Sequence, residues 1–446
     1  MSYIPRKIDR LLTEWRDFAS RKPLLIRGAR QVGKTSAVRK LAESFDHFVE
    51  INFDEQRVHK AVFESGLGIE EICEQLALLT GVPIEPGKTL LFLDEVQSCP
   101  EAIGALRFFH ERMPQLHVIA AGSLLEFALA ELPSFGVGRV RSVFMYPMSF
   151  DEFANALGEK QLINVLAKYH FHDPVPEPLH DRLLLIFKKF MIVGGMPEVV
   201  CAYANGQSML EVNRLLDDLV VSVQADFDKY KARFPAVRLV EVFGAIAAQC
   251  GSKFTYRYEG ASLSNVQVKE CLRLLKLAGL IYPVVHSSAN GIPLGAEANP
   301  KKTKYLIFDT GIFQRMLGLN VGELLVGDGV DLVNKGPLAE LTVGLELIKS
   351  SDAYNQKLLY YWHREQRNSE AELDYIEQVG TAIIPLEVKA GTKGSMRSLH
   401  LFLEEKQRQL GLRISSEHFG AFDTVCVLPI YAVFRLEALL KPMLER

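Results

Sequence analysis

The sequence predicts an α/β protein whose first domain is a parallel sheet with helices on both faces. Short apolar runs alternate with helical segments over residues 1–200, which is typical of parallel strands wrapped by helices. A glycine-rich phosphate-binding motif lies between the first of these runs and the helical segment after it. Strand-like runs return after residue 335, so we expect a smaller α/β domain at the C-terminal end.

The composition is that of a folded chain without an overall charge bias. Its 446 residues are about three times the ~150 residues of a typical domain, so two or three domains are expected. The 51 Lys and Arg residues nearly balance the 54 Asp and Glu residues, and the net charge of −3 creates no global basic field for nucleic acid. Any contact with DNA must therefore use a local basic patch.

Cysteine spacing and hydropathy exclude two further classes of protein. None of the 6 cysteines stands in C-x-x-C spacing, which argues against a metal knuckle or a redox site. The longest charge-free run, residues 277–296, contains two prolines and several polar residues and is no membrane span. No apolar segment of a secretory signal follows the N-terminal charges. We therefore expect a cytoplasmic protein with no membrane contact.

Five apolar runs predict the strands of the first sheet. Residues 89–93 and 117–121 are almost continuously apolar, as strands buried on both faces are, so we expect them at its centre. The other runs are residues 23–26, 47–53 and 142–146.

Helical periodicity dominates residues 147–233 and predicts a helical lid that extends to about residue 235. Gly194-Gly195-Met196-Pro197 must end one helix before another begins, because two glycines and a proline cannot continue it. From residue 236 to 320 the order is helix, turn, helix, strand, loop and strand, which predicts a winged-helix domain. The last domain, residues 335–446, begins with a helix at 337–350, and its strand-like runs are 357–362, 372–377 and 382–389.

The phosphate-binding motif is Gly28-Ala29-Arg30-Gln31-Val32-Gly33-Lys34-Thr35, which matches G-x-x-x-x-G-K-[ST] at every fixed position. In such a loop the backbone N–H groups and the following helix N-terminus face the phosphates, so we expect residues 28–36, with Ser36 the last, to bind ATP. Lys34 is expected to reach the β- and γ-phosphates, and the Thr35 hydroxyl to bind Mg²⁺.

Two carboxylates follow the third apolar run. Asp94 and Glu95 come at the end of a buried strand, the edge at which α/β sheets bind ligands. Asp94 suits the Mg²⁺ shell, and Glu95 is the candidate that polarises the attacking water. The alternative is that the pair only caps a helix, but the phosphate-binding motif favours the catalytic interpretation.

Ser123 and two arginines complete the candidates in the first domain. Ser123 follows the fourth run and either hydrogen-bonds the γ-phosphate or the water, or caps the helix at 124–130. Arg139 and Arg141 follow a glycine-containing loop. Either is a candidate arginine finger supplied to a neighbouring subunit, and the alternative is a solvated surface charge.

A second group of charged residues lies near the C-terminal end. Asp374 and Glu387 fall on strands that Val379-Gly380 can join as a turn, and Glu387 and Lys389 share one face because side chains in a strand alternate. The carboxylates are candidate ligands of a divalent metal, with Glu340 on the preceding helix as a further member, and Lys389 would stabilise or deprotonate a water. The alternative is a solvated strand face.

Basic residues of the predicted winged helix are candidates for DNA contact. Lys269, Arg273 and Lys276 follow helical spacing along residues 268–278. Basic helical faces are also often merely solvated, so both interpretations stay open. The predicted wing adds Lys301, Lys302 and Lys304.

These motifs together resemble a prokaryotic family of AAA+/STAND-like P-loop ATPases with a C-terminal domain of unknown function, and the resemblance covers nearly the whole chain. It implies an AAA+ core, a winged helix, and a restriction-endonuclease-like α/β domain of the PD-(D/E)XK type, in which Leu373 replaces the usual proline. It also favours Arg139 over Arg141 as the nucleotide-sensing arginine. The motifs that carry it are Ile4-Pro5-Arg6, residues 28–35, residues 91–97, Gly122-Ser123, Gly138-Arg139, residues 146–150, residues 194–197, residues 305–311, Tyr361-Trp362 and residues 386–389.

The motifs and the resemblance together lead to the hypothesis of a Mg²⁺-dependent ATPase whose nucleotide state controls a DNA-binding or DNA-cleaving C-terminal region. The alternative is a nucleotide-dependent signalling switch that acts through protein contacts and whose nuclease-like domain is inactive. ATP is the expected partner, and DNA and further copies of this chain are candidate partners.

Overall fold

The structure is a computed structural model that describes residues 3–131, 138–230, 235–256, 263–319, 335–365, 371–392 and 394–445. The chain forms two compact units. The first consists of Met1–Tyr146 with two short later segments, Leu277–Gly279 and Asp352–Gln356, and the second of the remaining residues. Within the described residues, no helix combines the length and the hydropathy needed to cross a membrane.

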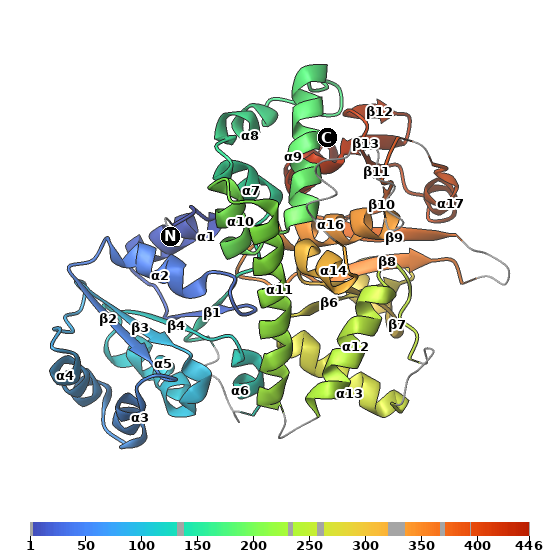
Figure 1. Ribbon diagram of the computed structural model, residues 1–446. Coiled ribbons are helices and arrows are strands. Elements are labelled where there is room, and N and C mark those ends of the chain that lie inside the picture. The colour runs from blue at the N-terminus through green and yellow to red at the C-terminus, as the bar shows by residue number, and fades with distance from the viewer. Residues whose placement is uncertain are drawn as a thin grey trace. The chain divides into compact units, whose positions relative to one another are not determined.

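A parallel five-stranded sheet forms the centre of the first unit (Figure 1). The strand order is β2-β3-β4-β1-β5, so β3 and β4 are interior strands, and every residue of both is buried. Parallel strands covered on both faces need such continuous apolar runs. The strands are β1 (Leu24–Arg27), β2 (His47–Asn52), β3 (Thr89–Asp94), β4 (His117–Ala121) and β5 (Arg141–Phe144).

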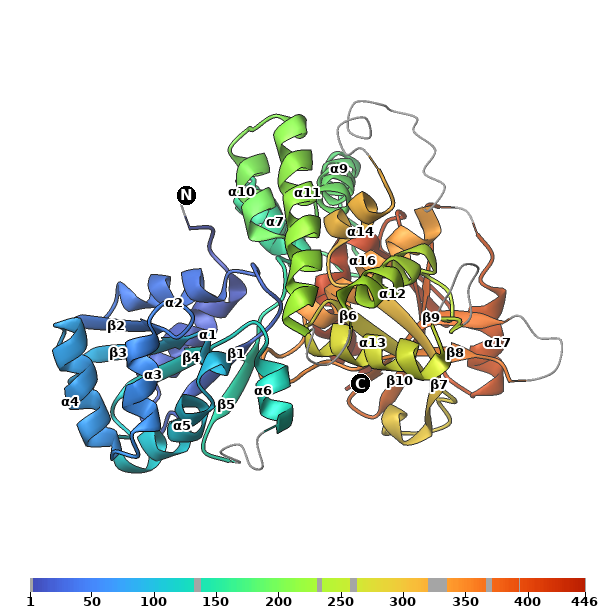
Figure 2. The same cartoon turned by 60° about the horizontal axis from the view of Figure 1, so that its bottom comes forward.

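Helices cover both faces of this sheet (Figure 2). Apolar side chains of α3, α4 and α5 form one core with the strands, whereas α1 and α2 lie against the opposite face. The helices are α1 (Lys7–Asp17), α2 (Lys34–Ala42), α3 (Arg57–Glu64), α4 (Ile69–Thr80), α5 (Pro100–Arg112) and α6 (Leu125–Glu131), with a short 3-10 helix η1 (Val96–Ser98) after β3. The predicted α/β fold class is confirmed, and the ends of the five strands predicted for this sheet are shifted by two residues at most.

Helices of the second unit follow the predicted breaks. α9 (Glu177–Val193) ends and α10 (Pro197–Ala204) begins at the predicted glycine-proline segment. Gly194 has φ +81°, and a Cβ there would lie 2.3 Å from the Asp309 carboxylate, so only glycine fits without strain. The other helices before the sheet are α7 (Phe150–Ala156), α8 (Lys160–Leu166), α11 (Met209–Asp226), α12 (Ala236–Ala248) and α13 (Asn265–Leu277).

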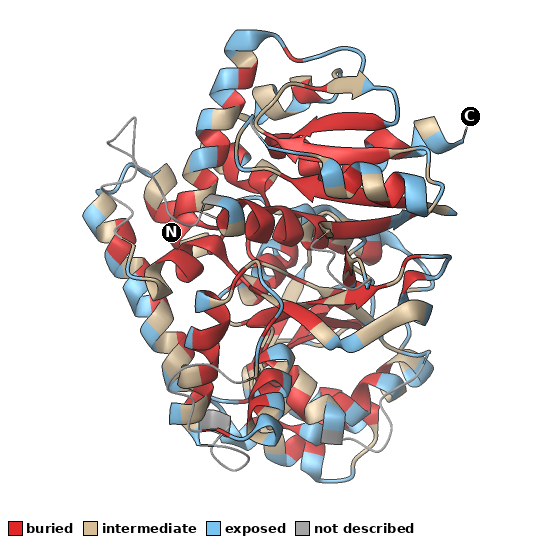
Figure 3. Cartoon of the chain, turned by 90° about the vertical axis from the view of Figure 1, so that its right-hand side faces the viewer, coloured by how far each residue is buried: buried red, intermediate tan, exposed pale blue. Residues whose placement is uncertain are grey.

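The second unit contains an eight-stranded mixed sheet in the order β12-β13-β11-β10-β9-β8-β6-β7. Its interior strands are largely buried, as the red arrows of Figure 3 show. The strands are β6 (Ile281–Ser287), β7 (Ala298–Ile307), β8 (Leu359–His363), β9 (Glu372–Val379), β10 (Ala382–Val388), β11 (Gly411–Ser415), β12 (Gly420–Phe422) and β13 (Val425–Pro429).

Helices also pack on this second sheet. α16 lies against β7 and β10, and α17 closes a separate apolar cluster in which Trp362 meets Phe402 edge-on at 5.1 Å between ring centroids. Further α-helices among the described residues are α14 (Thr310–Met316), α16 (Lys335–Lys349), α17 (Arg397–Glu405) and α18 (Leu436–Leu444).

The hairpin predicted as the wing of a winged helix is part of this same sheet. β6 pairs antiparallel with β7 on one side and parallel with β8 on the other, so the hairpin and the C-terminal strands are continuous. Hydrogen bonding between strands far apart in sequence leaves no periodic signal, so the sequence could not predict this pairing. The division into three domains stays a prediction, and its boundary at residues 320–334 lies outside the described residues.

Candidate functional site

The phosphate-binding motif forms the loop between β1 and the N-terminus of α2. Gly28 has φ +149°, and a Cβ there would lie 2.1 Å from the Met145 carbonyl oxygen, so the loop needs glycine at this close approach. Gly33 has φ +96° and directly precedes the first residue of α2. The loop therefore has the conformation in which backbone N–H groups and a helix N-terminus can face an anion.

Lys34 is buried at the first position of α2. Its ammonium donates to the carbonyl oxygens of Gly28 at 3.0 Å and Ala29 at 2.8 Å. Burial lowers the pKa of Lys34 to about 8, although the charges of Glu95 and Asp94 act in the opposite direction. Lys34 is thus mostly protonated at neutral pH and can neutralise phosphate charge.

Thr35 and Asp94, the predicted Mg²⁺ ligands, are in direct contact. The Thr35 hydroxyl donates to the Asp94 carboxylate at 2.9 Å, which joins α2 to the end of β3. Burial raises the pKa of Asp94, whereas the hydrogen bonds from Thr35 and the Glu95 backbone lower it. A hydroxyl and a carboxylate are oxygen donors of the kind that Mg²⁺ prefers, so this pair fits the predicted cofactor.

Glu95 is held by side chains from two neighbouring segments. It has φ +49°, a left-handed conformation that is uncommon for a residue with a Cβ and is frequent at functional sites. Gln97 donates to its Oε2 at 2.6 Å, and the Ser123 hydroxyl donates to the same oxygen at 3.3 Å. Arg30 of the phosphate loop donates to the Ser123 hydroxyl at 3.1 Å.

Three further residues hold this site together: Arg30, which was expected to bind ATP as part of the phosphate loop, and Gln97 and Arg6, which had no predicted role. Gln97 and Arg30 extend the contacts of Glu95 and Ser123, and they belong to the motifs at residues 91–97 and 28–35. Arg6 donates to the carbonyl oxygens of Val32 and Tyr146, at 2.9 Å in each case. Arg6 therefore ties the phosphate loop to the residues after β5, and only its place in a short N-terminal motif pointed to it.

The two candidate arginine fingers make contacts outside the phosphate loop. Arg139 forms an ion pair with Glu111 of α5, and both side chains are exposed. The Arg141 guanidinium lies 5.0 Å from the centroid of the Tyr354 ring. Neither of these contacts includes a residue of the phosphate loop, so a role as finger stays a prediction that requires a neighbouring copy.

The C-terminal carboxylates lie on paired strands, as the turn at Val379-Gly380 predicted. β9 and β10 are antiparallel, and the Asp374 carboxylate accepts from the Val388 N–H at 2.7 Å. Lys389 donates to Glu387 at 2.5 Å, so these two side chains share a face. Burial, with the nearby charge of Asp374, raises the pKa of Glu387 to about 7.

A buried lysine also reaches the acidic residues. Lys304 of β7 is 1 % exposed, and its ammonium lies 2.9 Å from Glu340 and 2.6 Å from Glu372. Burial raises the pKa of Glu340 to about 8, although the charge of Lys304 lowers it. The expectation that Lys304 contributes to a basic surface of the wing is therefore wrong, because its ammonium is buried and paired with Glu340 and Glu372.

Metal binding by the C-terminal group stays untested. Within the described ranges, no three His, Cys, Asp and Glu side chains form a group that could hold a metal ion. The charge of Asp374 raises the pKa of both Glu340 and Glu387, so Asp374 lies near each of these two carboxyls.

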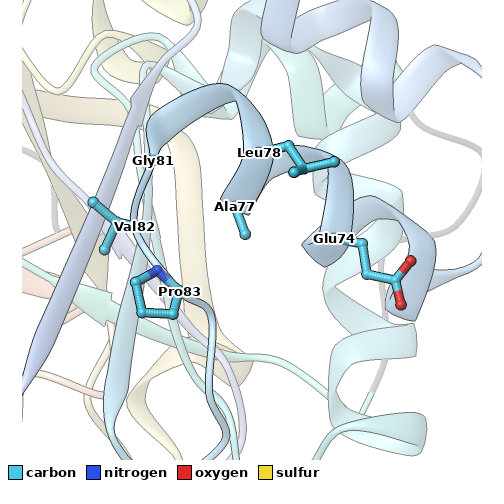
Figure 4. Close-up of a pocket in the computed structure, with 6 residues that line it drawn as sticks. All are labelled: Glu74, Ala77, Leu78, Gly81, Val82 and Pro83. Carbon is cyan, nitrogen blue, oxygen red and sulfur yellow. The ribbon is translucent and has the colours of Figure 1, made fainter.

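A hollow of about 560 Å³ lies at the C-terminal end of α4 (Figure 4). None of its lining residues belongs to the phosphate loop or to the C-terminal carboxylates, so it has no part in either candidate site. The residues drawn are Glu74, Ala77, Leu78, Gly81, Val82 and Pro83.

Comparisons with known proteins divide the chain into three matched segments. Residues 20–154 match a family described as an AAA domain. Residues 185–323 and 335–433 match two families that are each described only as a domain of unknown function (DUF8612 and DUF4143). No curated protein matches the chain.

Two solved structures are distantly similar to the chain. A Walker-type ATPase of Pyrococcus abyssi is 17% identical, with 71% of this chain and 96% of that chain covered and a TM-score of 0.45. The Aeropyrum pernix ORC1 protein, solved in complex with DNA, is 14% identical, with 73% and 94% covered and a TM-score of 0.30. Because these TM-scores are low, neither likeness supports a fold assignment, which depends on the strand order and the phosphate loop.

Proposed function

We propose that this chain hydrolyses ATP with Mg²⁺ in its first unit, a P-loop ATPase domain of the AAA type. Its nucleotide state is proposed to control a DNA-binding or DNA-cleaving C-terminal region. The observation that carries the ATPase part is the meeting of four side chains at one edge of the parallel sheet. Lys34 and Thr35 come from α2, and Asp94 and Glu95 from the end of β3. These are the charge, the metal ligands and the water-orienting group that phosphoryl transfer needs.

Binding of ATP is proposed to use residues 28–36. Lys34 neutralises charge on the β- and γ-phosphates, and the loop N–H groups bind their oxygens. Thr35 and Asp94 would hold Mg²⁺, which supplies further positive charge to the phosphates when bound.

Hydrolysis is proposed to depend on the orientation of a water by Glu95. Gln97 and Ser123 both donate to Oε2 of Glu95 and so restrict the directions in which its other oxygen can accept a hydrogen bond. Arg30 positions Ser123 in turn. Because phosphoryl transfer depends mainly on positioning and charge compensation, this restriction supports catalysis more than a change in basicity would. Arg139 is the proposed finger, donated to a neighbouring copy of the chain.

Turnover and binding of ATP test this assignment separately. Glu95→Gln is expected to keep ATP affinity and to lower kcat by about 100-fold or more, since it loses the carboxylate but keeps the size of the side chain. Lys34→Ala is expected to lose nucleotide binding. Glu70→Gln, at an exposed glutamate of α4, serves as the matched control. Hydrolysis by Glu95→Gln at the unaltered rate would show that Glu95 does not orient the water.

A second function is a nucleotide-dependent switch that acts through protein contacts, with an inactive nuclease-like domain. It is favoured by the buried Lys304, whose ammonium lies 2.9 Å from Glu340, one of the carboxylates that a nuclease would use for metal. Nicking of plasmid DNA with Mg²⁺ or Mn²⁺, with and without ATP, separates the two functions. Nicking that disappears in Lys389→Ala would support a nuclease, and no nicking under any condition would support the switch.

A further inference from the structure

Lys304 occupies a position that is unusual for a lysine. Its side chain is 1 % exposed, and lysine is almost never fully buried unless its charge is paired. Two carboxylates, Glu340 of α16 and Glu372 of β9, lie within 3 Å of its ammonium, and the ring centroid of Tyr361 lies 5.1 Å away. The ammonium is therefore enclosed by acidic and aromatic groups from separate elements.

A third carboxylate, that of Asp374, acts on the same ammonium. The negative charge of Asp374 raises the pKa of Lys304, as the charges of Glu340 and Glu372 do. The register between β8 and β9 shifts just beside Asp374, where β9 carries one residue more than β8. Such bulges re-aim side chains and are frequent next to functional sites.

The carboxyl groups of this cluster outnumber its ammonium groups. Four carboxylates, of Glu340, Glu372, Asp374 and Glu387, face the two ammonium groups of Lys304 and Lys389. Glu387 is a buried residue, and its Oε2 has no hydrogen-bond partner in the part of the chain that the structure describes. A buried carboxylate oxygen without a partner costs free energy, which a bound cation would recover.

We propose that the Lys304 ammonium is a built-in cation that takes the place of a divalent metal ion among Glu340, Glu372 and Asp374. The carboxylates then bind a positive charge that belongs to the chain itself, instead of a metal ion that exchanges with solvent. An ammonium donates hydrogen bonds but offers no Lewis acidity and no open coordination position, so the site in this state would not activate a water. This inference uses the carboxylates of the proposed nuclease-like region but does not depend on ATP hydrolysis.

Removal of the Lys304 charge is expected to convert the cluster into a cation site. Free Mn²⁺ is titrated by electron paramagnetic resonance without nucleotide, in full-length protein that carries Asp94→Asn so that the phosphate loop contributes no ligand. The parent is expected to show no Mn²⁺ site that depends on Asp374. Lys304→Met is expected to gain one such site, with Mn²⁺ affinity raised by about tenfold or more, because a competing unit charge is gone. Adding Asp374→Asn should abolish the gain.

Lys302→Met is the matched control, because Lys302 lies on the same strand but pairs with the exposed Glu365. It should leave Mn²⁺ binding unchanged. If Lys304→Met does not fold, as judged by circular dichroism, Lys304→Gln is titrated instead, since the amide keeps a donor for Glu340 or Glu372. An Asp374-dependent Mn²⁺ site already present in the parent, or a folded Lys304 variant that gains none, would overturn the proposal. Neither result would bear on ATP turnover, so failure of this inference is distinguishable from failure of the ATPase assignment.

Discussion

At Lys34, burial and neighbouring charges act on the same proton in opposite directions. Burial favours the neutral amine, whereas Glu95 and Asp94 favour the ammonium, and the pKa of Lys34 lies at about 8 as a result. A bound triphosphate adds negative charge and would raise this pKa. Binding of nucleotide at and above pH 8 should therefore be coupled to the uptake of a proton.

Nucleotide affinity is predicted to fall as the pH rises from 7 to 9. The free protein has a pKa of about 8 at Lys34 and the complex has a higher one, so the complex binds more protons and alkaline pH opposes its formation. Calorimetry with a non-hydrolysable ATP analogue, in two buffers of different ionisation enthalpy, measures both the affinity and the proton uptake. Constant affinity over this range without proton uptake would contradict a role for the Lys34 charge in binding.

The residue after β4 and the 3-10 helix η1 approach each other closely near Glu95. Gly122 follows β4, and a Cβ at this position would lie 2.1 Å from Oε1 of Gln97. Gln97 is also the residue whose amide holds Glu95. The small size of Gly122 thus allows two elements to place one catalytic candidate.

Gly122→Ala is predicted to lower kcat by about fivefold to tenfold and to leave ATP affinity nearly unchanged. The added methyl group displaces Gln97, and the loss of one positioning hydrogen bond corresponds to about 1 kcal/mol. Gly104→Ala, in α5, is the matched control because nothing lies within 4 Å of an added Cβ there. Equal kcat values for the two variants would mean that Gln97 does not position Glu95.

The first sheet was predictable from sequence because β3 and β4 are buried on both faces and so must be apolar throughout. The hairpin β6-β7 was also predictable as a pair of strands. The parallel pairing of β6 with β8 was not, since β6 ends at Ser287 and β8 begins only at Leu359, and no local pattern specifies a distant partner.

For the whole molecule, a net charge of −3 means that DNA affinity must come from a local surface. The candidate is the exposed side of α13, with Lys269, Arg273 and Lys276, and Arg273 already forms an ion pair with Glu270 at 2.7 Å. Lys304 contributes nothing to this surface because it is buried. The two proposed functions differ in one testable respect: a protein that binds or cleaves DNA would contact DNA phosphates through α13, and a protein-contact switch would not.

DNA affinity is predicted to fall steeply with salt in the nucleotide state that favours binding. Each phosphate contact releases a counterion, so Lys276→Ala should reduce the slope of log affinity against log salt by about one. Fluorescence anisotropy of a labelled duplex, with ADP and with a non-hydrolysable ATP analogue, measures this slope. Lys441→Ala, at an exposed lysine of α18 paired with Glu437, is the control. A salt-independent affinity in both states would favour the protein-contact switch.

By itself, the sequence determined the parallel sheet, the phosphate loop and the positions of Lys34, Thr35, Asp94 and Glu95, because each depends on local spacing and on the direction of neighbouring strands. Tertiary structure alone decided which side chains surround them. The support of Glu95 by Gln97 and Ser123, and the burial of Lys304 between Glu340 and Glu372, depend on elements brought together by strand pairing and packing. From sequence, a lysine in a basic run is expected at the surface. Whether such a charge is buried depends on carboxylates that are distant in sequence, and only the tertiary structure shows them.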